Sequence, residues 1–480
     1  MPRMWVLVAA VLGSSMTFID GSATNVILPI IQAQLHASAE DAQWVVEGFA
    51  LVLSALILTG GSLGDVFGRR LVFVLGVVLF GLASIGCGIA ASPAILIGSR
   101  CVQGAGAALM TPGSLALISA SFTGAERGRA IGTWAGFASL TSAAGPVLGG
   151  YLAQTFSWRA VFFINIPLAI GTILIALLAV PESRDDAAPR TVDVPGIALA
   201  TFGLFALTFG LIREERPLID PAGFGAIVAG VAGLVAFVWW ERRAKTPMMP
   251  PFLFADRSFA VLNAYTLLLY APLGASLYFL PYVLIDVQHF SPVEAGAALL
   301  PLVAVQFALS RWSGGNVARL GVRLPLVIGA CFGGVAFLLF ALPGAGAGYL
   351  PGYLLAVLAL AAGVTWFVAP LTTGVLDAAP RSHSGIASGV NNAVSRVAGL
   401  LAIAVFGIVL ANAFSGGIPG PAALGRSIAL REAFLTGYRH VVYLSAAISF
   451  AAAALAWFGI PKRIATVPPS GHPSAVRSSA

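Results

Sequence analysis

The sequence predicts an all-α membrane protein with fourteen transmembrane helices. Mean hydropathy is +0.93 over 480 residues, and only 9% of the residues are charged. Such a chain has too few polar side chains to cover a water-soluble globule, so lipid must surround most of its surface. Charge-poor runs long enough to cross about 30 Å of hydrocarbon recur along the whole chain.

Apolar runs, glycine and proline breaks and basic loops delimit these helices. The predicted spans are residues 5–30, 42–63, 71–91, 94–121, 129–155, 160–181, 193–213, 219–240, 258–285, 293–312, 322–342, 349–370, 384–411 and 438–460. One boundary follows from length, because residues 324–376 contain no charge and would make a single helix about 80 Å long. The chain must therefore turn back, and the glycines of residues 344–348 are the best place for the turn.

The basic residues indicate the orientation. With the N-terminus in the cytoplasm, 18 of the 26 Lys and Arg residues fall in cytoplasmic segments, 6 fall outside, and Arg100 and Arg396 lie within spans. Cytoplasmic loops are enriched in Lys and Arg, so we expect both termini in the cytoplasm. Residues 1–19 could pass for a secretory signal, but Asp20 follows and no small-residue cleavage site is evident, which favours a retained first helix.

A ten-residue repeat indicates how the helices are grouped. Residues 61–70, GSLGDVFGRR, align without a gap with residues 314–323, GGNVARLGVR, and three positions are identical. The offset carries the second span onto the tenth, so two of the intervening helices are extra to a six-helix repeat. Two parallel halves are the layout of transporters that rock around a central substrate site.

The predicted organisation has four parts. They are an N-terminal six-helix bundle at residues 1–190, two additional helices with a linker at 191–245, a C-terminal six-helix bundle at 246–463, and a disordered cytoplasmic tail at 464–480.

Six short motifs lie on these helices. They are FIDGSATNVILP (18–29), GSLGDVFGRR (61–70), LIGSRCVQGAGAA (96–108), GPVLGG (145–150), SWRAVFFINIP (157–167) and SGVNNAVSRVAG (388–399). Together they resemble the motifs of the major facilitator superfamily, specifically of its fourteen-span drug:proton antiporters, along nearly the whole chain. Val66 is a departure, because the family usually has arginine there.

The resemblance implies a major facilitator fold and a transport function. A protein of this kind would be a proton-coupled antiporter that exports hydrophobic small molecules or drugs across the cytoplasmic membrane by alternating access. The alternatives are a proton-coupled uptake symporter and an exporter of one specific metabolite. The GPVLGG motif implies export rather than uptake.

The first of the repeated decapeptides is the candidate conformational latch. The resemblance implies that Gly61, Asp65, Gly68, Arg69 and Arg70 hold the cytoplasmic side closed. Glycines permit a tight approach of two helices, and an aspartate can accept hydrogen bonds from a helix N-terminus. We expect the two arginines to anchor at anionic headgroups. The alternative is a basic loop that only fixes topology, which would need no aspartate.

The fifth span carries the candidate antiporter motif, Gly145, Pro146, Gly149 and Gly150. Gly145 and Gly149 have the spacing that lets another helix come close, and Pro146 is expected to bend the span. Spacing alone favours ordinary helix packing. The resemblance implies instead that the motif marks exporters.

Three charged residues within spans are the candidates for proton coupling: Asp20, Arg100 and Glu47. An ionisable side chain inside the membrane is costly and usually faces a cavity or a partner. Counted along their helices, the three lie at similar depth in the outer half of the membrane. A guanidinium favours the ionised form of a carboxylate, so a moving Arg100 could switch Asp20 between holding and releasing a proton. The alternatives are a structural hydrogen bond for Asp20 and an interfacial position for Glu47.

A further set of polar and aromatic side chains is the candidate lining of a substrate cavity: Asn25, Gln103, Trp134, Trp366, Asn392 and Arg396. Packing or lipid contact is the alternative for the tryptophans. Arg396 could instead bridge backbone carbonyls.

Other function classes lack their sequence signatures. The chain has only two lysines, Lys245 and Lys462, and neither follows a glycine-rich phosphate loop, which argues against direct use of ATP. The five histidines have no zinc-binding spacing, and no nucleophile elbow or selectivity-filter loop is present, which disfavours an intramembrane enzyme or a channel. We expect no cofactor, metal or nucleic acid, and as partners a small hydrophobic substrate, protons and the bilayer.

The outer segment at residues 412–438 has two interpretations. It could dock a periplasmic adaptor, as in some relatives, or form a loose loop, and its glycine and proline content favours the loop. Without an adaptor we expect a monomer.

Overall fold

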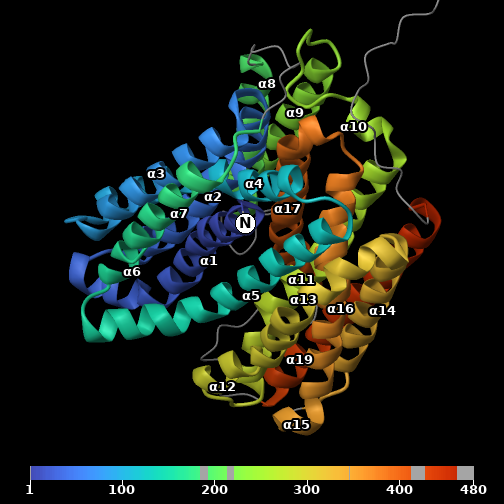
Figure 1. Ribbon diagram of the computed structural model, residues 1–480. Coiled ribbons are helices and arrows are strands. Elements are labelled where there is room, and N and C mark those ends of the chain that lie inside the picture. Colours follow the sequence, from blue (N-terminus) through green and yellow to red (C-terminus); the bar gives the residue numbers. More distant parts are fainter. Residues whose placement is uncertain (1, 184–192, 213–220, 345, 412–427, 462–480) are drawn as a thin grey trace, which may run out of the picture.

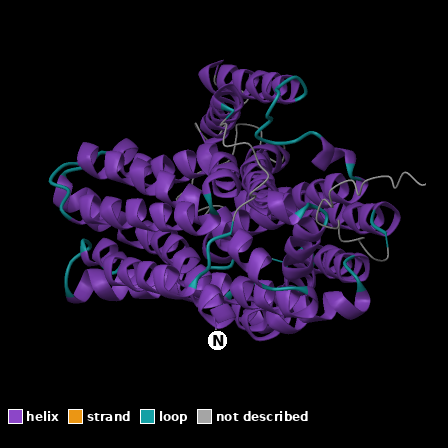
Figure 2. Cartoon of the chain, turned by 45° about the horizontal axis from the view of Figure 1, so that its top comes forward, coloured by secondary structure: helices purple, strands orange, loops and turns teal. Residues whose placement is uncertain are grey.

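The computed structural model describes residues 2–183, 193–212, 221–344, 346–411 and 428–461. These residues form helices joined by short connections and contain no strand (Figure 2), which confirms the predicted all-α class. All fourteen predicted spans correspond to helices of the structure.

The first six spans form the N-terminal half. Its helices are α1 (Pro2–Leu35), α2 (Ala39–Phe67), α3 (Arg69–Gly88), α4 (Pro93–Ser121), α5 (Gly124–Thr155), α6 (Ala160–Phe163) and α7 (Asn165–Ala179). Ser38 and Asp41 form a capping box that begins α2, and the Ser92 side chain caps α4. Gly68 has φ +119°, a conformation that favours glycine and lets the chain turn between α2 and α3 within one residue.

The rest of the chain contains the additional pair and the C-terminal half. The additional helices are α8 (Val194–Ile212) and α9 (Pro221–Glu241). The later elements are α10 (Phe252–Ala255), α11 (Arg257–Tyr282), the π-helix η1 (Val283–Val287), α12 (Pro292–Ala297), α13 (Leu300–Leu320), α14 (Arg323–Phe340), α15 (Tyr349–Gly352), α16 (Leu354–Asp377), the 3₁₀ helix η2 (Arg381–His383), α17 (Ser384–Ala411) and α19 (Ile428–Gly459). The charge-free run ends its first helix at Phe340 and resumes at Tyr349, so the turn lies where the glycines predict it.

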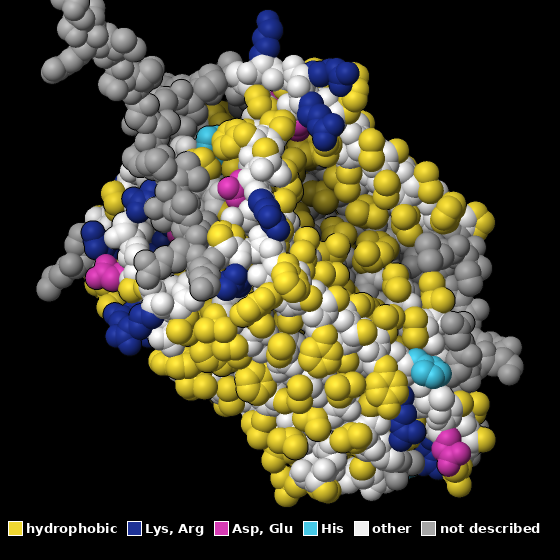
Figure 3. Space-filling model, turned by 90° about the vertical axis from the view of Figure 1, so that its right-hand side faces the viewer, with side chains coloured by type: hydrophobic (Ala, Val, Ile, Leu, Met, Phe, Trp, Pro, Cys, Tyr) yellow, Lys and Arg dark blue, Asp and Glu magenta, His cyan; other side chains and the backbone are white. Residues whose placement is uncertain are grey.

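Thirteen helices in the described part of the chain are long and apolar enough to cross a membrane. The fourteenth is α5, whose glycine, serine, threonine and arginine content lowers its hydropathy. It has 32 residues and packs between α1 and α13, so we count it with the spans. Apolar side chains cover the middle of the face in Figure 3, and charged side chains lie mostly towards its margins, as expected of a surface in contact with lipid.

The two halves lie at an angle to each other (Figure 1). Helices α1, α2, α3, α4 and α7 pack together at the left of the view, whereas α11, α13, α14, α16 and α19 pack together at its lower right. The main packing across the halves is α2 against α17 and α5 against α13. These contacts gather where α2 and α16 end and where α5 and α17 begin, and we call this the closed end.

The additional pair packs on the N-terminal half through α8 and α2. Its two helices are tied where α8 begins and α9 ends, because Trp240 donates a hydrogen bond to Asp193 at 2.9 Å. The buried Glu241 accepts one from the backbone N–H of Met249 at 2.9 Å. These bonds join the pair to the linker that leads into the second half.

The predicted start of the last span is wrong, and two predicted segments lie partly or wholly outside the described residues. The outer segment was expected to run from residue 412 to 438. However, α19 already begins at Ile428, so the last helix is longer than predicted and the outer segment is shorter. Charged and polar side chains at Arg431 and Glu432 hid this extra helix from a hydropathy pattern. Residues 412–427 and the predicted tail at 464–480 lie outside the described part of the chain.

Candidate functional site

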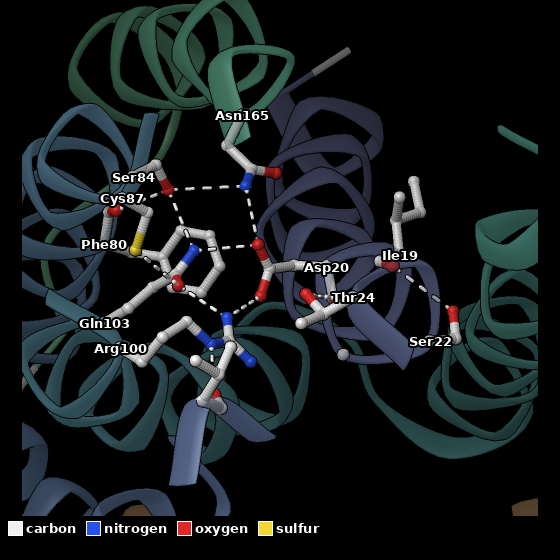
Figure 4. Close-up of polar contacts among 12 residues, drawn as sticks. Ile19, Asp20, Ser22, Thr24, Phe80, Ser84, Cys87, Arg100, Gln103 and Asn165 are labelled. Atoms are coloured by element: carbon white, nitrogen blue, oxygen red, sulfur yellow. Dashed lines mark hydrogen bonds and ion pairs between the residues drawn. The ribbon is translucent and has the colours of Figure 1, made fainter. Parts of the chain in front are cut away.

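Asp20 lies at the centre of a buried polar cluster between α1, α3, α4 and α7 (Figure 4). Its side chain and that of Arg100 are both 0% exposed and form an ion pair. Asp20 also accepts hydrogen bonds from Gln103 at 2.9 Å and Asn165 at 3.0 Å. Side chains from two other helices, α4 and α7, therefore hold this carboxylate, and its charge is compensated at the place where a lone charge would be most costly.

Arg100 is held on several sides. Its Nε donates to the carbonyl of Val45 at 2.9 Å, and Nη1 also donates to Gln103 at 2.6 Å. The guanidinium carbon lies 4.3 Å from the centre of the Phe49 ring. The remaining nitrogen, Nη2, is buried and has no hydrogen-bond partner in the described residues. The arginine is thus fixed to α2 as well as to Asp20, so a shift of α2 against α1 would change the contact.

Sequence reasoning missed Asn165 and Ser84. Asn165 begins α7 directly after the break at Ile164, and this break directs its amide towards α1. Ser84 accepts hydrogen bonds from Gln103 at 2.9 Å and from Asn165 at 3.3 Å. The SWRAVFFINIP motif contains Asn165, and that motif was the available signal.

Glu47 does not join this cluster. Its side chain is partly exposed and accepts a hydrogen bond from Gln43 at 2.6 Å, one turn earlier on α2. The similar depth of Glu47 and Asp20 did not bring them together, because side chains at Val45 and Glu47 leave the helix in different directions. We therefore keep Asp20 and Arg100 as the candidate proton site.

The glycines of the fifth-span motif face α1 beside this cluster. A Cβ at Gly145 would overlap Ser22, and a Cβ at Gly149 would lie 2.9 Å from the Cβ of Ala23. At Gly150 the nearest atom would be 3.9 Å away, on Val26, which is an ordinary contact. Gly145 and Gly149 thus permit the close approach of α5 to the segment of α1 that carries Asp20, and Gly150 is not needed for it.

The decapeptide at residues 61–70 lies at the closed end, against the start of α17. Asp65 accepts hydrogen bonds from the backbone N–H groups of Gly385 at 3.0 Å and Ile386 at 2.8 Å. This is the carboxylate at a helix N-terminus that the sequence predicts. A Cβ at Gly61 would overlap the carbonyl of Gly385, so the backbones of α2 and α17 approach closely there.

The expected headgroup anchoring is wrong for Arg69. Its side chain is 5% exposed, pairs with Asp65 at 2.9 Å, and donates to the carbonyls of Arg381 and Ser382 across the halves. Arg70 is more exposed and binds within its own half, where Nη1 donates to the carbonyl of Val180 at 3.1 Å. The charge pattern alone could not show which arginine turns inward.

An ion pair also joins the halves at the closed end. Arg127 at the start of α5 contacts Asp377 at the end of α16, with 2.7 Å between Nη1 and Oδ1. Beside it, Gly128 and Gly314 bring α5 and α13 so close that a Cβ on either would overlap the other's carbonyl. Arg127 entered the sequence argument only as a basic loop residue, because its partner lies 250 residues further along the chain.

The candidate cavity residues do not form one cluster. Gln103 is 0% exposed and fully engaged with the Asp20 cluster, so its assignment to a substrate cavity is wrong for this conformation. Trp134 is buried, and its Nε1 donates to Ser14 at 2.9 Å. Asn25 is exposed on α1 and donates to the carbonyl of Gly21.

The other three cavity candidates are partly exposed on the second half. Trp366 packs edge to face on Trp312, with ring centres 5.1 Å apart. Asn392 donates to the carbonyl of Ser388 at 2.9 Å. Arg396 forms no ion pair with any carboxylate of the described residues, and its Nε has no hydrogen-bond partner there.

Comparison with known proteins gives consistent matches. A family model described as the Major Facilitator Superfamily matches residues 10–403. The chain is 32% identical over 424 residues to the tetracenomycin C resistance and export protein of Streptomyces glaucescens, covering 85% of this chain and 76% of that protein. It is 35% identical over 415 residues to the multidrug resistance protein Stp of Mycobacterium tuberculosis, with the same two coverages.

A solved structure shares the fold. The human organic anion transporter MFSD10 superimposes with a TM-score of 0.64, covering 95% of this chain and 100% of that chain. At 15% sequence identity this likeness concerns the fold alone.

Proposed function

Because the chain belongs to the Major Facilitator Superfamily, and is therefore a membrane transporter and not an enzyme, we propose that it is a proton-coupled antiporter that exports hydrophobic small molecules. The names of its relatives, which refer to antibiotic resistance and export, support export of drug-like compounds. We place it in the cytoplasmic membrane with both termini inside, on the distribution of its basic residues. Its partners are the small-molecule substrate and protons, and without a periplasmic adaptor it acts as a monomer.

The observation that carries the proposal is the buried pair of Asp20 and Arg100. Asp20 exchanges the coupling proton, and Arg100 is the cation that competes with that proton for the carboxylate. When the halves rock, α2 carries the Val45 carbonyl and Phe49, both of which contact Arg100. This movement changes the contact between Arg100 and Asp20, so Asp20 binds its proton more tightly in one arrangement than in the other.

The closed end supplies the gate. Asp65, Arg69, Arg127 and Asp377 link the halves at one end, where α2 meets α17 and α5 meets α16. Breaking these links would open that end towards the cytoplasm. Since both the gate and the candidate proton site involve α2, one helix movement serves both, which is what alternating access requires.

Asp20→Asn tests the coupling role. The amide keeps the size and most hydrogen bonds of Asp20 but cannot exchange a proton, so export driven by an imposed pH gradient should fall to background in proteoliposomes. Substrate-induced proton release from the purified protein should also stop. The measurement uses a panel of drug-like compounds and a pH-sensitive dye.

Glu47→Gln is the matched control, because it removes a half-buried carboxylate of a span at similar depth. We expect it to export and release protons like the parent. If Asp20→Asn couples normally and Glu47→Gln does not, the proton site belongs to Glu47. Uptake symport is distinguished by the sign of the proton movement, since a symporter would move substrate and proton in the same direction.

A further inference from the structure

Buried hydroxyl groups lie next to the Asp20 cluster, between α1 and α4. Thr17 and Ser14 precede Asp20 by one and two turns, and Thr111 and Ser114 are their counterparts on α4. All four side chains are nearly inaccessible, with residue exposures of 3% for Ser14, 6% for Thr17, 4% for Thr111 and 0% for Ser114. None of them has a part in the site described above.

The hydroxyls of this group that lie farther from Asp20 are hydrogen-bonded. The hydroxyls of Ser14 and Ser114 lie 3.0 Å apart, and the indole N–H of Trp134 donates to Ser14 at 2.9 Å. Ser114 donates to the carbonyl of Thr111 at 2.7 Å. On its other side, this group adjoins the Asp20 cluster. Gln103 and Arg100 of that cluster come from the same face of α4 as Thr111 and Ser114.

The hydroxyls of Thr17 and Thr111 lie along α1 and α4 between these two polar clusters. Both oxygen atoms are buried and have no hydrogen-bond partner among the described residues. A threonine inside a helix ordinarily donates to the carbonyl four residues earlier, as Thr24 does to Asp20 at 2.7 Å. Leaving a buried hydroxyl unsatisfied costs free energy, so each of these two is suited to bind something else.

We propose that water bound between Thr17 and Thr111 connects Asp20 with the Ser14 and Ser114 hydroxyls and forms the route by which the coupling proton leaves Asp20. A water molecule needs two or more polar partners, which the two threonine hydroxyls provide together. Along α1 the route runs about 4.5 Å to Thr17 and about 9 Å to Ser14. The inference rests on the proposed role of Asp20 and adds the path to it.

The transfer moves a single proton. Protonated Asp20 gives its proton to the neighbouring water, and each hydroxyl or water in turn accepts one proton and passes on another. Asp20 ends as a carboxylate paired with Arg100, and one proton is added to water beyond Ser14. The route heads towards the closed end through the interior of the N-terminal half.

Thr17→Val and Thr111→Val test the route. Valine has nearly the shape of threonine, and removing a buried hydroxyl that has no hydrogen-bond partner among the described residues breaks no protein hydrogen bond, so folding should be preserved, which thermal melting would check. Stopped-flow measurement with a pH dye should show that substrate-induced proton release is slowed about tenfold or more in each variant, with an unchanged number of protons released. Thr17→Ser, which restores a hydroxyl, should recover the parent rate.

Thr24→Val is the control. Thr24 is equally buried on α1 and lies one turn beyond Asp20 on the other side, with its hydroxyl already engaged. Parent rates in both Thr17→Val and Thr111→Val, with Asp20→Asn inactive, would overturn the route and leave the antiporter proposal intact. Slowing by Thr24→Val as large as by Thr17→Val would also overturn it. No proton release from the parent with any transported substrate would overturn the antiporter proposal itself.

Discussion

Arg100 is the residue whose loss should be least tolerated. It is 0% exposed and donates hydrogen bonds to three groups at once: the Asp20 carboxylate, the Val45 carbonyl and the Gln103 amide. Arg100→Leu would leave Asp20 as an uncompensated buried charge, and such losses cost about 3–5 kcal/mol. We expect a clearly lower melting temperature and no export.

The double variant Arg100→Leu with Asp20→Leu separates charge from packing. It removes both charges, and replacing a buried pair by apolar residues is often neutral. We therefore expect much of the thermal stability to return while export stays absent. A double variant as unstable as Arg100→Leu alone would show that Arg100 acts mainly through its other contacts.

Among the helices, α5 changes partners halfway along its length. Its first half packs on α13, where Gly132 accepts a hydrogen bond from Ser310 at 2.7 Å, and its second half packs on α1 through Gly145 and Gly149. One continuous helix thus connects the contact between the halves with the helix that carries Asp20. This arrangement gives the fifth-span motif a mechanical meaning, because a shift of α5 acts on both.

Gly149→Ala and Gly150→Ala make a matched pair that tests this packing. A methyl group at Gly149 would lie 2.9 Å from the Ala23 Cβ, which forces α5 away from α1. At Gly150 the nearest atom, on Val26, would be 3.9 Å away. Alanine favours a helix over glycine by about 1 kcal/mol. We expect Gly150→Ala to be neutral or slightly stabilising with full export, and Gly149→Ala to lower both melting temperature and export. Equal behaviour of the two would show that the approach of α5 to α1 is not critical.

In the whole molecule, the polar contacts that join the two halves at the closed end include two unlike contacts made by carboxylates. One is Asp65 with the N-terminus of α17, and the other is the ion pair of Arg127 with Asp377. The first contact lies where α2 packs on α17, and the second lies where α5 packs on α13 and α16. These two places correspond to each other in the repeat of the two halves. Because either contact holds only in this arrangement, both favour the conformation described here over one that opens towards the cytoplasm.

Asp65→Asn and Asp377→Asn should each weaken the closed end. Each substitution removes a charge from hydrogen bonds worth about 1–3 kcal/mol. The two together should shift the population towards the conformation open to the cytoplasm further than either alone. Spin labels at Phe67 and Leu320, both exposed near this end, would report longer distances in the variants by double electron–electron resonance. Export should slow although membrane insertion stays normal.

Asp41→Asn serves as the comparison, since Asp41 belongs to the capping box at the opposite end of α2. It should leave the label distances unchanged. Parent-like distances and turnover in the Asp65→Asn and Asp377→Asn double variant would mean that these contacts do not govern closure.

Local chemistry made much of this architecture predictable. Fourteen helices follow from hydropathy and length, because a spanning segment must satisfy its own backbone hydrogen bonds and needs a fixed number of apolar residues. The candidate pair of Asp20 and Arg100 could also be selected, since charges are rare in spans and these two lie at similar depth. The contact of Asp65 with a helix N-terminus was predictable for the same reason, because charges are scarce and an aspartate there needs a partner.

What the sequence by itself determined is therefore the set of helices and the charges that need an explanation. Only the tertiary structure decided which charges meet. It placed Arg69 between the halves, paired Arg127 with Asp377, brought Asn165 to Asp20, and left Glu47 outside the cluster. The physical reason is that hydropathy measures transfer from water to lipid one segment at a time. The pairing of side chains depends instead on helix rotation and close backbone approach, which are set by packing between segments far apart in the chain.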